Sequence, residues 1–313
     1  MSSLFLFGAG ASFGSGPCVP DNPPLGAQLF PALQANGGVA ANVSPELAQL
    51  FVSDFEAGMD RFWTEHNSSV SALLRDMARF FAPFAPLPGN LYFELIKVLG
   101  GTRKKATFVT TNYDILIEHA VIKSGFGVVY RGIAVEKGMI PVLKIHGSCH
   151  FLPDMPANKI QLIDVNVAGL KTVDGKQAGI VEVPCRVAED AQEVIDFCNT
   201  EKSLAPALAM YSPAKPIPYC QGFVEKQQKE WLIALDHAAR IYVVGLRVHL
   251  VDEHIWGPLA KAKAPIYYVG REPDTFMQWA KDNGRKGASV LAKSFVEAFP
   301  GFAAHHHFRP KRA

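Results

Sequence analysis

The sequence predicts an α/β fold built on a doubly wound parallel sheet. Short runs of apolar or β-branched residues, typical of strands buried on both faces, recur along the chain. Segments with the hydrophobic spacing of helices lie between these runs. Most of the runs end in glycine turns or polar residues, as strands do where an open sheet forms a ligand site. Strands and helices are therefore expected to alternate.

Five runs are the predicted strands of this sheet: residues 4–7, 106–110, 142–145, 241–245 and 265–269. Leu91, Leu95 and Leu99 have helical spacing ahead of the second run. Trp231 and Leu235 have it ahead of the fourth. Because parallel strands need a crossover connection, which is usually a helix, this order predicts parallel pairing.

Two long intervals interrupt the alternation. Residues from about 36 to 104 form a predicted helical insert, in which residues 72–81 are the clearest amphipathic segment. Residues from about 149 to 238 form a mixed insert with polar, extended and helical parts. We therefore predict one domain, residues 1–313, that carries both inserts.

The composition is that of a soluble globular protein. The chain has 313 residues, is 49% hydrophobic and carries 31 basic against 29 acidic residues, a net charge of +2. This balance requires neither a membrane nor sequence-specific contact with nucleic acid. There is no apolar stretch of roughly 20 residues, as a membrane span needs, and no signal-peptide pattern. We expect a cytoplasmic protein.

The five cysteines are far apart in the sequence and include no CxxC pair. This spacing indicates neither a zinc ribbon nor a disulfide framework. We therefore predict buried free thiols and no metal site.

A glycine turn, GAGAS at residues 8–12, follows the first predicted strand. Gly8 and Gly10 would let the backbone approach a pyrophosphate, whose charge would meet the N–H groups that start the next helix. The GxGxxG fingerprint fails by one residue, because position 13 is Phe and the third glycine is Gly14. A glycine turn without a ligand is the alternative.

Polar residues also follow the second and third predicted strands. Asn112 and Asp114 lie in TTNYD, ahead of a predicted helix. Asp114 could simply cap that helix, whereas a buried Asn112 amide needs partners. His146 ends the third strand and has the side chain best suited to proton transfer near neutral pH. A core histidine is the alternative for His146.

The motifs GAGAS with a following SG, TxNxD, HGS and a strand ending in VG occur in the order seen in the sirtuin family, which this chain resembles. The resemblance implies a Rossmann-like sheet and a site for NAD. It implies that the glycine turn holds the pyrophosphate, that Asn112 and Asp114 border the nicotinamide ribose, and that His146 acts on the ribose hydroxyls. The expected NAD-binding residues are Gly8, Ala9, Gly10, Ala11, Ser12, Asp21, Thr110, Gly245, Arg247, Gly270 and Arg271.

The chain also departs from the deacylating sirtuins. Their two CxxC pairs, which hold a structural zinc, have no counterpart after HGS. SGPCVPDNPPLG replaces SGIPDFR, so Asp21 is the candidate for the aspartate that contacts the nicotinamide amide. Leu246 and Arg247 replace a small hydroxyl residue, and Arg247 could contact a phosphate or remain solvated. Asp252 replaces the motif of the acyl-lysine channel.

These departures resemble the zinc-free, NAD-consuming effectors of bacterial anti-phage systems. The resemblance implies an NAD hydrolase that releases nicotinamide and ADP-ribose, with Asn112, His146 and Asp114 as catalytic residues and NAD as the substrate. Such an enzyme would be gated, through a homo-oligomer or a separate activating protein. A protein deacylase and a non-catalytic sensor of NAD or ADP-ribose are the alternatives.

Overall fold

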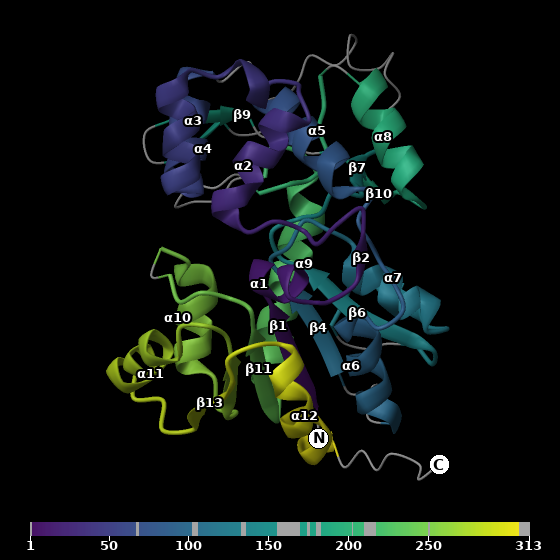
Figure 1. The fold of residues 1–313 in the computed structure, drawn as a ribbon, viewed down its shortest axis with the longest axis vertical. Coiled ribbons are helices and arrows are strands. Elements are labelled where there is room, and N and C mark those ends of the chain that lie inside the picture. Colours follow the sequence, from purple (N-terminus) through teal and green to yellow (C-terminus); the bar gives the residue numbers. More distant parts are fainter. Residues whose placement is uncertain are drawn as a thin grey trace.

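The molecule is built around a parallel sheet, as Figure 1 shows in a computed structural model. The structure describes residues 2–66, 69–101, 106–132, 136–154, 170–173, 176–179, 183–201, 203–209, 217–249 and 251–306. Seven strands are hydrogen-bonded in the order β13-β12-β11-β1-β4-β6-β5, and every neighbouring pair is parallel. The predicted α/β class with a Rossmann-like sheet is confirmed.

All five predicted strands belong to this sheet: β1 (Ser3–Phe7), β4 (Ala106–Thr110), β6 (Met139–Lys144), β11 (Arg240–Val244) and β12 (Ile266–Val269). The two edge strands, β5 (Gly127–Val129) and β13 (Ala288–Ala292), were not predicted from the sequence. Both are only partly buried, so neither needs the continuous apolar run that marks a central strand.

Helices cover both faces of the sheet, so the side chains of each central strand alternate between two cores. Phe5 and Phe7 belong to the core shared with α6 (Leu91–Leu99), α7 (Leu116–Lys123) and α12 (Phe299–His306). Leu4 and Leu6 belong to the core shared with α9 (Gln221–Asp236), α10 (Glu253–Lys261) and α11 (Pro273–Asp282). No helix in the described ranges is long and apolar enough to cross a membrane.

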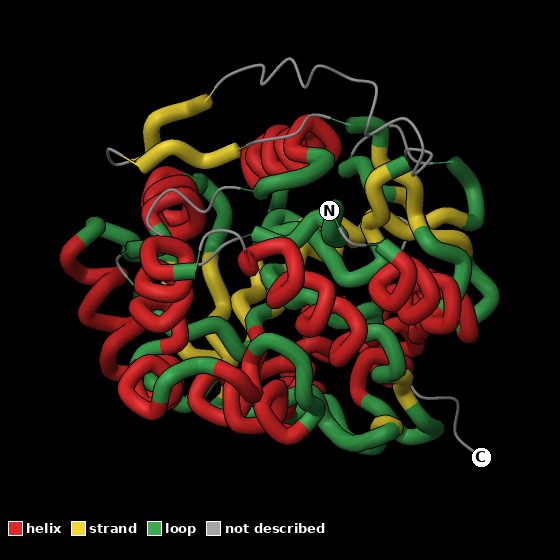
Figure 2. Tube along the Cα trace, turned by 90° about the horizontal axis from the view of Figure 1, so that it is seen from above, coloured by secondary structure: helices red, strands yellow, loops and turns green. Residues whose placement is uncertain are grey.

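A smaller lobe lies beyond the carboxyl ends of the strands (Figure 1). Its helices are α2 (Gly26–Ala35), α3 (Pro45–Ser53), α4 (Phe55–Glu65), α5 (Val70–Phe81) and α8 (Ala191–Thr200), with the 3₁₀ turn η1 (Ala40–Asn42). Its strands form the antiparallel pairs β2 (Cys18–Val19) with β3 (Ala85–Pro86), and β7 (Phe151–Pro153) with β10 (Cys185–Val187). The hairpin of β8 (Leu170–Val173) and β9 (Lys176–Gly179) lies at the edge of the view in Figure 2. A last 3₁₀ turn, η4 (Val296–Ala298), precedes α12.

Polar residues fix where several of these helices begin. The Ser44 hydroxyl and the Asp54 carboxylate accept hydrogen bonds from backbone N–H groups in the first turns of α3 and α4, at 3.2 and 3.0 Å. Asn90 does the same for α6 at 3.0 Å, and Asp190 for α8 at 2.9 Å. Each side chain satisfies a donor that the helix itself leaves unpaired.

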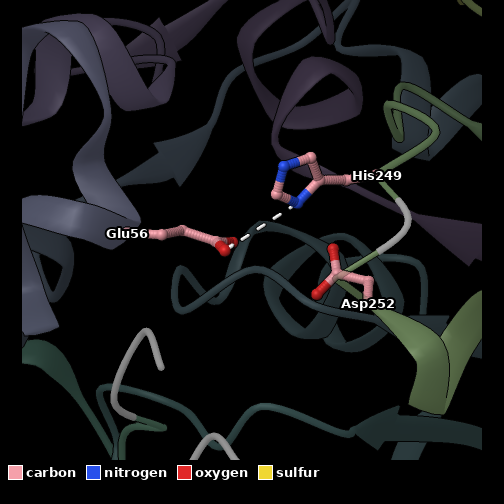
Figure 3. A group of neighbouring side chains, drawn as sticks. All are labelled: Glu56, His249 and Asp252. Carbon is pink, nitrogen blue, oxygen red and sulfur yellow. Dashed lines mark ion pairs between the residues drawn. The ribbon is translucent and has the colours of Figure 1, made fainter. Parts of the chain in front are cut away.

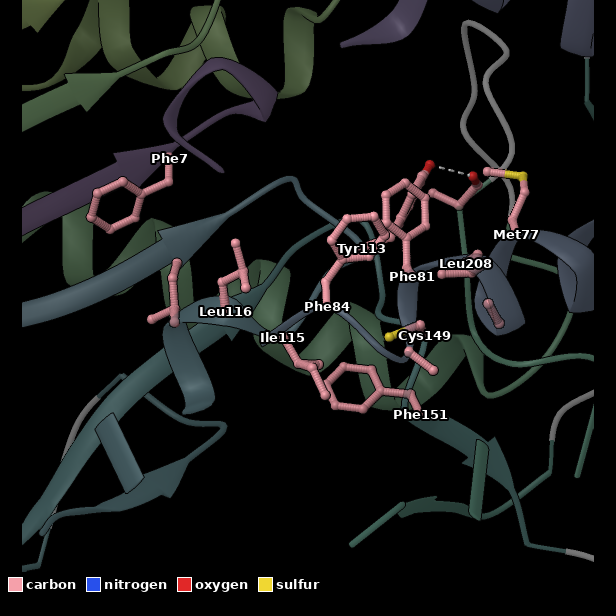
Figure 4. Packing of buried hydrophobic residues seen from close by; sticks show 14 of the residues in the cluster. Phe7, Met77, Phe81, Phe84, Tyr113, Ile115, Leu116, Cys149, Phe151 and Leu208 are labelled. Atoms are coloured by element: carbon pink, nitrogen blue, oxygen red, sulfur yellow. Dashed lines mark hydrogen bonds between the residues drawn. The ribbon is translucent and has the colours of Figure 1, made fainter. Parts of the chain in front are cut away.

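Apolar packing joins the two intervals that the sequence analysis treated as inserts. Figure 4 shows Met77 and Phe81 of α5 beside Tyr113, Cys149 and Leu208. The Tyr113 hydroxyl also donates to the carbonyl oxygen of Ala209 at 2.9 Å. The helices that precede α6 and the segment that follows HGS therefore build one lobe, which packs at the carboxyl ends of the strands.

A buried ion group ties β6 to α7. The Lys144 ammonium donates to the carbonyl oxygen of Asp114 and lies 3.3 Å from a carboxylate oxygen of Glu118. Burial raises the pKa of the Asp114 and Glu118 carboxyls above their usual range, and the Lys144 charge opposes that rise. Because all three groups are almost fully buried, the lysine is the main compensation for two buried acids.

Candidate functional site

A cavity of about 610 Å³ opens beyond the carboxyl ends of the central strands. The connection from β1 leads to β4 on one side, whereas β11 leads to β12 on the other, so the direction of winding reverses between β1 and β11. Ligands of open α/β sheets bind at such a reversal, and the volume lies within the range of small-molecule sites.

The cavity walls come from both parts of the molecule. The sheet contributes the turn after β1, His146 after β6, and the residues that follow β11, β12 and β13. The small lobe contributes the start of α2 and residues 52–56 at the junction of α3 and α4. A ligand here would therefore contact both the sheet and the small lobe.

The glycines of the predicted phosphate turn are required because this turn packs closely against the backbone of the turn after β11. A Cβ atom at Gly8 would lie 2.7 Å from the carbonyl oxygen of Gly245, and one at Gly10 would lie 2.9 Å from the same atom. Gly245 has φ +64°, and a Cβ there would lie 2.1 Å from the backbone nitrogen of Ala11. These three glycines let the turn after β1 touch the turn after β11. A substitution of Gly10 would thus disturb the fold, and any loss of ligand binding in such a variant would not report on a direct contact with the ligand.

Asn112 organises the glycine turn from the inside. Its amide nitrogen donates to the carbonyl oxygen of Gly8 at 3.0 Å and to the Ser12 hydroxyl at 2.9 Å. Its backbone N–H donates to the Thr110 hydroxyl at 3.0 Å, and Ser12 also shares a hydrogen bond with Tyr92. Both amide hydrogens of Asn112 are used in this way, so only its amide oxygen remains for an external group.

His146 is the predicted catalytic residue that lies on the cavity wall. It is 3% exposed, and its Nε2 lies 2.7 Å from Nε2 of His254, a hydrogen bond between two imidazoles. One ring must supply the proton and the other the lone pair. His254 was not predicted, because it stands 108 residues further along the chain with no motif around it.

The third predicted catalytic residue, Asp114, faces inward. One carboxylate oxygen accepts the backbone N–H of Leu116 at 3.1 Å at the start of α7, as a capping residue would. Asp114 is 4% exposed and does not line the cavity. Asp114 therefore stabilises the start of α7 through its carboxylate and contacts the buried Lys144 through its carbonyl oxygen.

The other histidine of this region, His150, is part of an internal chain. Its ring nitrogens lie 2.8 Å from the Ser148 hydroxyl and 2.6 Å from the Tyr130 hydroxyl. Burial lowers the pKa of His150 well below its usual range, so the ring is neutral. Ser148 is fully buried, so the hydrogen bonds of Ser148 and His150 stabilise the fold of the HGS segment.

Seven of the predicted site residues line the cavity: Ala9, Gly10, His146, Gly245, Arg247, Gly270 and Arg271. Seven others do not: Gly8, Ala11, Ser12, Asp21, Thr110, Asn112 and Asp114. Asp21 is exposed and accepts the backbone N–H of Asn22 at 2.7 Å. Arg247 is 75% exposed and forms an ion pair with Glu272 at 3.2 Å. Arg271 lies over the ring of Phe13, 5.9 Å from its centroid.

Sequence reasoning also missed a group of ionisable residues on the cavity wall. Glu56 comes from α4, His249 from the segment after β11, and Asp252 from the start of α10. Only Asp252 was singled out in the sequence. Glu56 lies in the helical lobe, almost 200 residues away, so no local pattern could link it to the other two.

Comparison with known proteins gave matches among solved structures only. No family model and no curated protein sequence matches the chain. A point mutant of a Sir2 homologue in complex with ADP-ribose has 15% identity and a TM-score of 0.48, covering 98% of this chain and 92% of that one. A Sir2 homologue in complex with NAD has 15% identity and a TM-score of 0.48, with coverages of 98% and 89%.

Proposed function

We propose that the protein is an NAD hydrolase that cleaves the bond between nicotinamide and ribose. The observation that carries the proposal is the position of His146 on the wall of a cavity at the point where the sheet reverses its winding. A dinucleotide would place its pyrophosphate against the turns after β1 and β11, and its nicotinamide ribose toward His146.

The chemistry needs little from the protein beyond position and charge. The positively charged pyridinium ring leaves the ribose as neutral nicotinamide, so its departure needs no acid. The electron pair of the breaking bond goes to the ring, and water attacks the oxocarbenium-like carbon of the ribose. His146 accepts the proton that the water loses, and the products are nicotinamide and ADP-ribose.

Two residues position the groups that react. His254 fixes the orientation of the His146 ring through the 2.7 Å hydrogen bond. Asn112 positions the glycine turn with its amide nitrogen, and because it does not line the cavity we assign it no direct contact with substrate. Asp114 acts through α7 and Lys144, and we assign it no contact with substrate.

A deacylase on the same cavity would need a strand edge that can pair with a peptide. In the described part of the segment after HGS, residues 151–153 do not offer one, because Phe151 and Leu152 are fully buried and β7 pairs with β10. The carbonyl oxygen of Phe151 also accepts the backbone N–H of Ala207 at 2.8 Å. This arrangement favours the hydrolase.

Unrestrained hydrolysis of NAD would deplete the cell that makes the enzyme. We therefore propose that the activity is gated, either by assembly of identical chains or by a separate activating protein, as in an anti-phage effector. Size-exclusion chromatography with light scattering, with and without NAD, measures the first route.

The proposal predicts that the purified protein, alone or with its activator, releases nicotinamide and ADP-ribose in equal amounts from NAD without any acylated peptide. Chromatography of a prolonged incubation at high protein concentration measures both products. If nicotinamide were released only when an acylated peptide is added, the deacylase would be the correct assignment.

A further inference from the structure

Three side chains with metal-binding chemistry converge on the cavity wall. Figure 3 shows Glu56 and His249 pointing toward each other, with the Asp252 carboxylate beside them. One ligand atom from each lies within 4.8 Å of those of the other two. Glu56 Oε2 and His249 Nδ1 are 3.8 Å apart, which is longer than a hydrogen bond.

We propose that Glu56, His249 and Asp252 bind a divalent metal ion, of which Mn²⁺ is the best representative. Carboxylates suit Mg²⁺ and Mn²⁺, and imidazole suits the first-row transition metals, so a set of two carboxylates and one imidazole fits Mn²⁺ on both counts. Ca²⁺ requires six to eight oxygen ligands, whereas one of the three ligands here is an imidazole nitrogen.

The geometry allows the ligands to close on an ion. Metal–ligand bonds of about 2.0–2.2 Å place ligand atoms at most roughly 4.4 Å apart, so the three atoms need to approach by only about an ångström. Asp252 is buried at the start of α10 and is the fixed member. His249 and Glu56 are 45% and 24% exposed, and both side chains are longer than that of Asp252.

The position of the cluster suggests what else the ion would contact, an argument that rests on the proposed function. All three residues line the cavity that we assign to NAD. Three protein ligands leave coordination positions open toward the cavity, and phosphate oxygens commonly fill such positions on Mg²⁺ and its relatives. The ion would also neutralise two carboxylates that would otherwise repel a pyrophosphate.

Binding of the metal can be measured without NAD and without activity. Chelator-treated full-length protein is titrated with Mn²⁺ and followed by electron paramagnetic resonance of the free ion. We expect saturable binding of one Mn²⁺ per chain, and at least tenfold weaker binding by His249→Gln and by Glu56→Gln. Glu65→Gln is the matched control, because Glu65 is an exposed glutamate in α4, paired with Arg61.

Absence of saturable Mn²⁺ binding, or equal affinity in His249→Gln and the wild type, would overturn the proposal and leave only a surface ion pair. Titration of ADP-ribose into the metal-free protein separates the two proposals. If ADP-ribose binds and Mn²⁺ does not, the metal site fails alone. If Mn²⁺ binds and ADP-ribose does not bind with or without it, the proposed function fails alone.

Discussion

Replacing His146 with alanine is expected to lower the rate of NAD hydrolysis by roughly 10² or more, the scale for losing a general base. The side chain lies on the cavity wall and its ring is held by His254, so the substitution removes the proton acceptor and leaves the glycine turns in place. Initial rates of nicotinamide release measure the effect, and the melting temperature reports on the fold.

His237→Ala is the control for this substitution. His237 is an exposed histidine at the end of α9 and does not line the cavity. We expect its rate to equal that of the wild type. A His146→Ala protein with a normal rate and a normal melting temperature would remove His146 from the mechanism.

Replacing Lys144 with methionine should lower the free energy of unfolding by about 3–5 kcal/mol, the usual cost of removing one partner from a buried ion pair. The substitution leaves the Asp114 and Glu118 carboxyls buried without the cation that opposes their desolvation. Chemical denaturation at neutral pH measures the loss. Lys97→Met, in an exposed pair with Glu94, should change stability by at most about 1 kcal/mol.

The loss should depend on pH in one direction. The folded-state pKa of both carboxyls is raised, so their contribution to stability is complete below the unfolded-state pKa and is lost as the pH rises through the folded-state value. Removing Lys144 raises the folded-state pKa of both carboxyls further. The loss in free energy of unfolding that Lys144→Met causes should therefore be larger at pH 8 than at pH 5. Adding Glu118→Gln should recover part of the stability. A deficit that is below 1 kcal/mol at both pH values would contradict this account of the ion group.

The sheet could be predicted from the sequence because central strands are buried on both faces and must be apolar throughout. The edge strands β5 and β13 lie partly in contact with solvent and carry no such pattern. The carboxyl ends of the strands could likewise be predicted, and His146, which follows one of them, lies on the cavity wall.

The sequence could not predict which residues would line the site and which would only hold its turns in place. A glycine that approaches a ligand and a glycine that approaches distant backbone look identical in sequence, and Gly8 and Gly10 contact a turn more than 230 residues away. Asn112 likewise donates both of its amide hydrogens to the glycine turn. Glu56 and His254 join the site through tertiary packing alone.

We propose above all that the cavity between the turns after β1 and β11 binds the ADP-ribose part of NAD. Ala9 is an exposed residue on the cavity wall, and a glutamate there would add bulk and negative charge to the proposed pyrophosphate site. Ala304 is an exposed alanine of α12 that does not line the cavity, which makes Ala304→Glu the matched control.

Calorimetric titration of ADP-ribose into these proteins tests the claim most directly. We predict saturable binding to the wild type and to Ala304→Glu with equal affinity. For Ala9→Glu we predict at least tenfold weaker binding, or about 1.4 kcal/mol, with an unchanged circular dichroism spectrum. No binding to the wild type, or equal binding by folded Ala9→Glu, would contradict the assignment of this cavity to NAD.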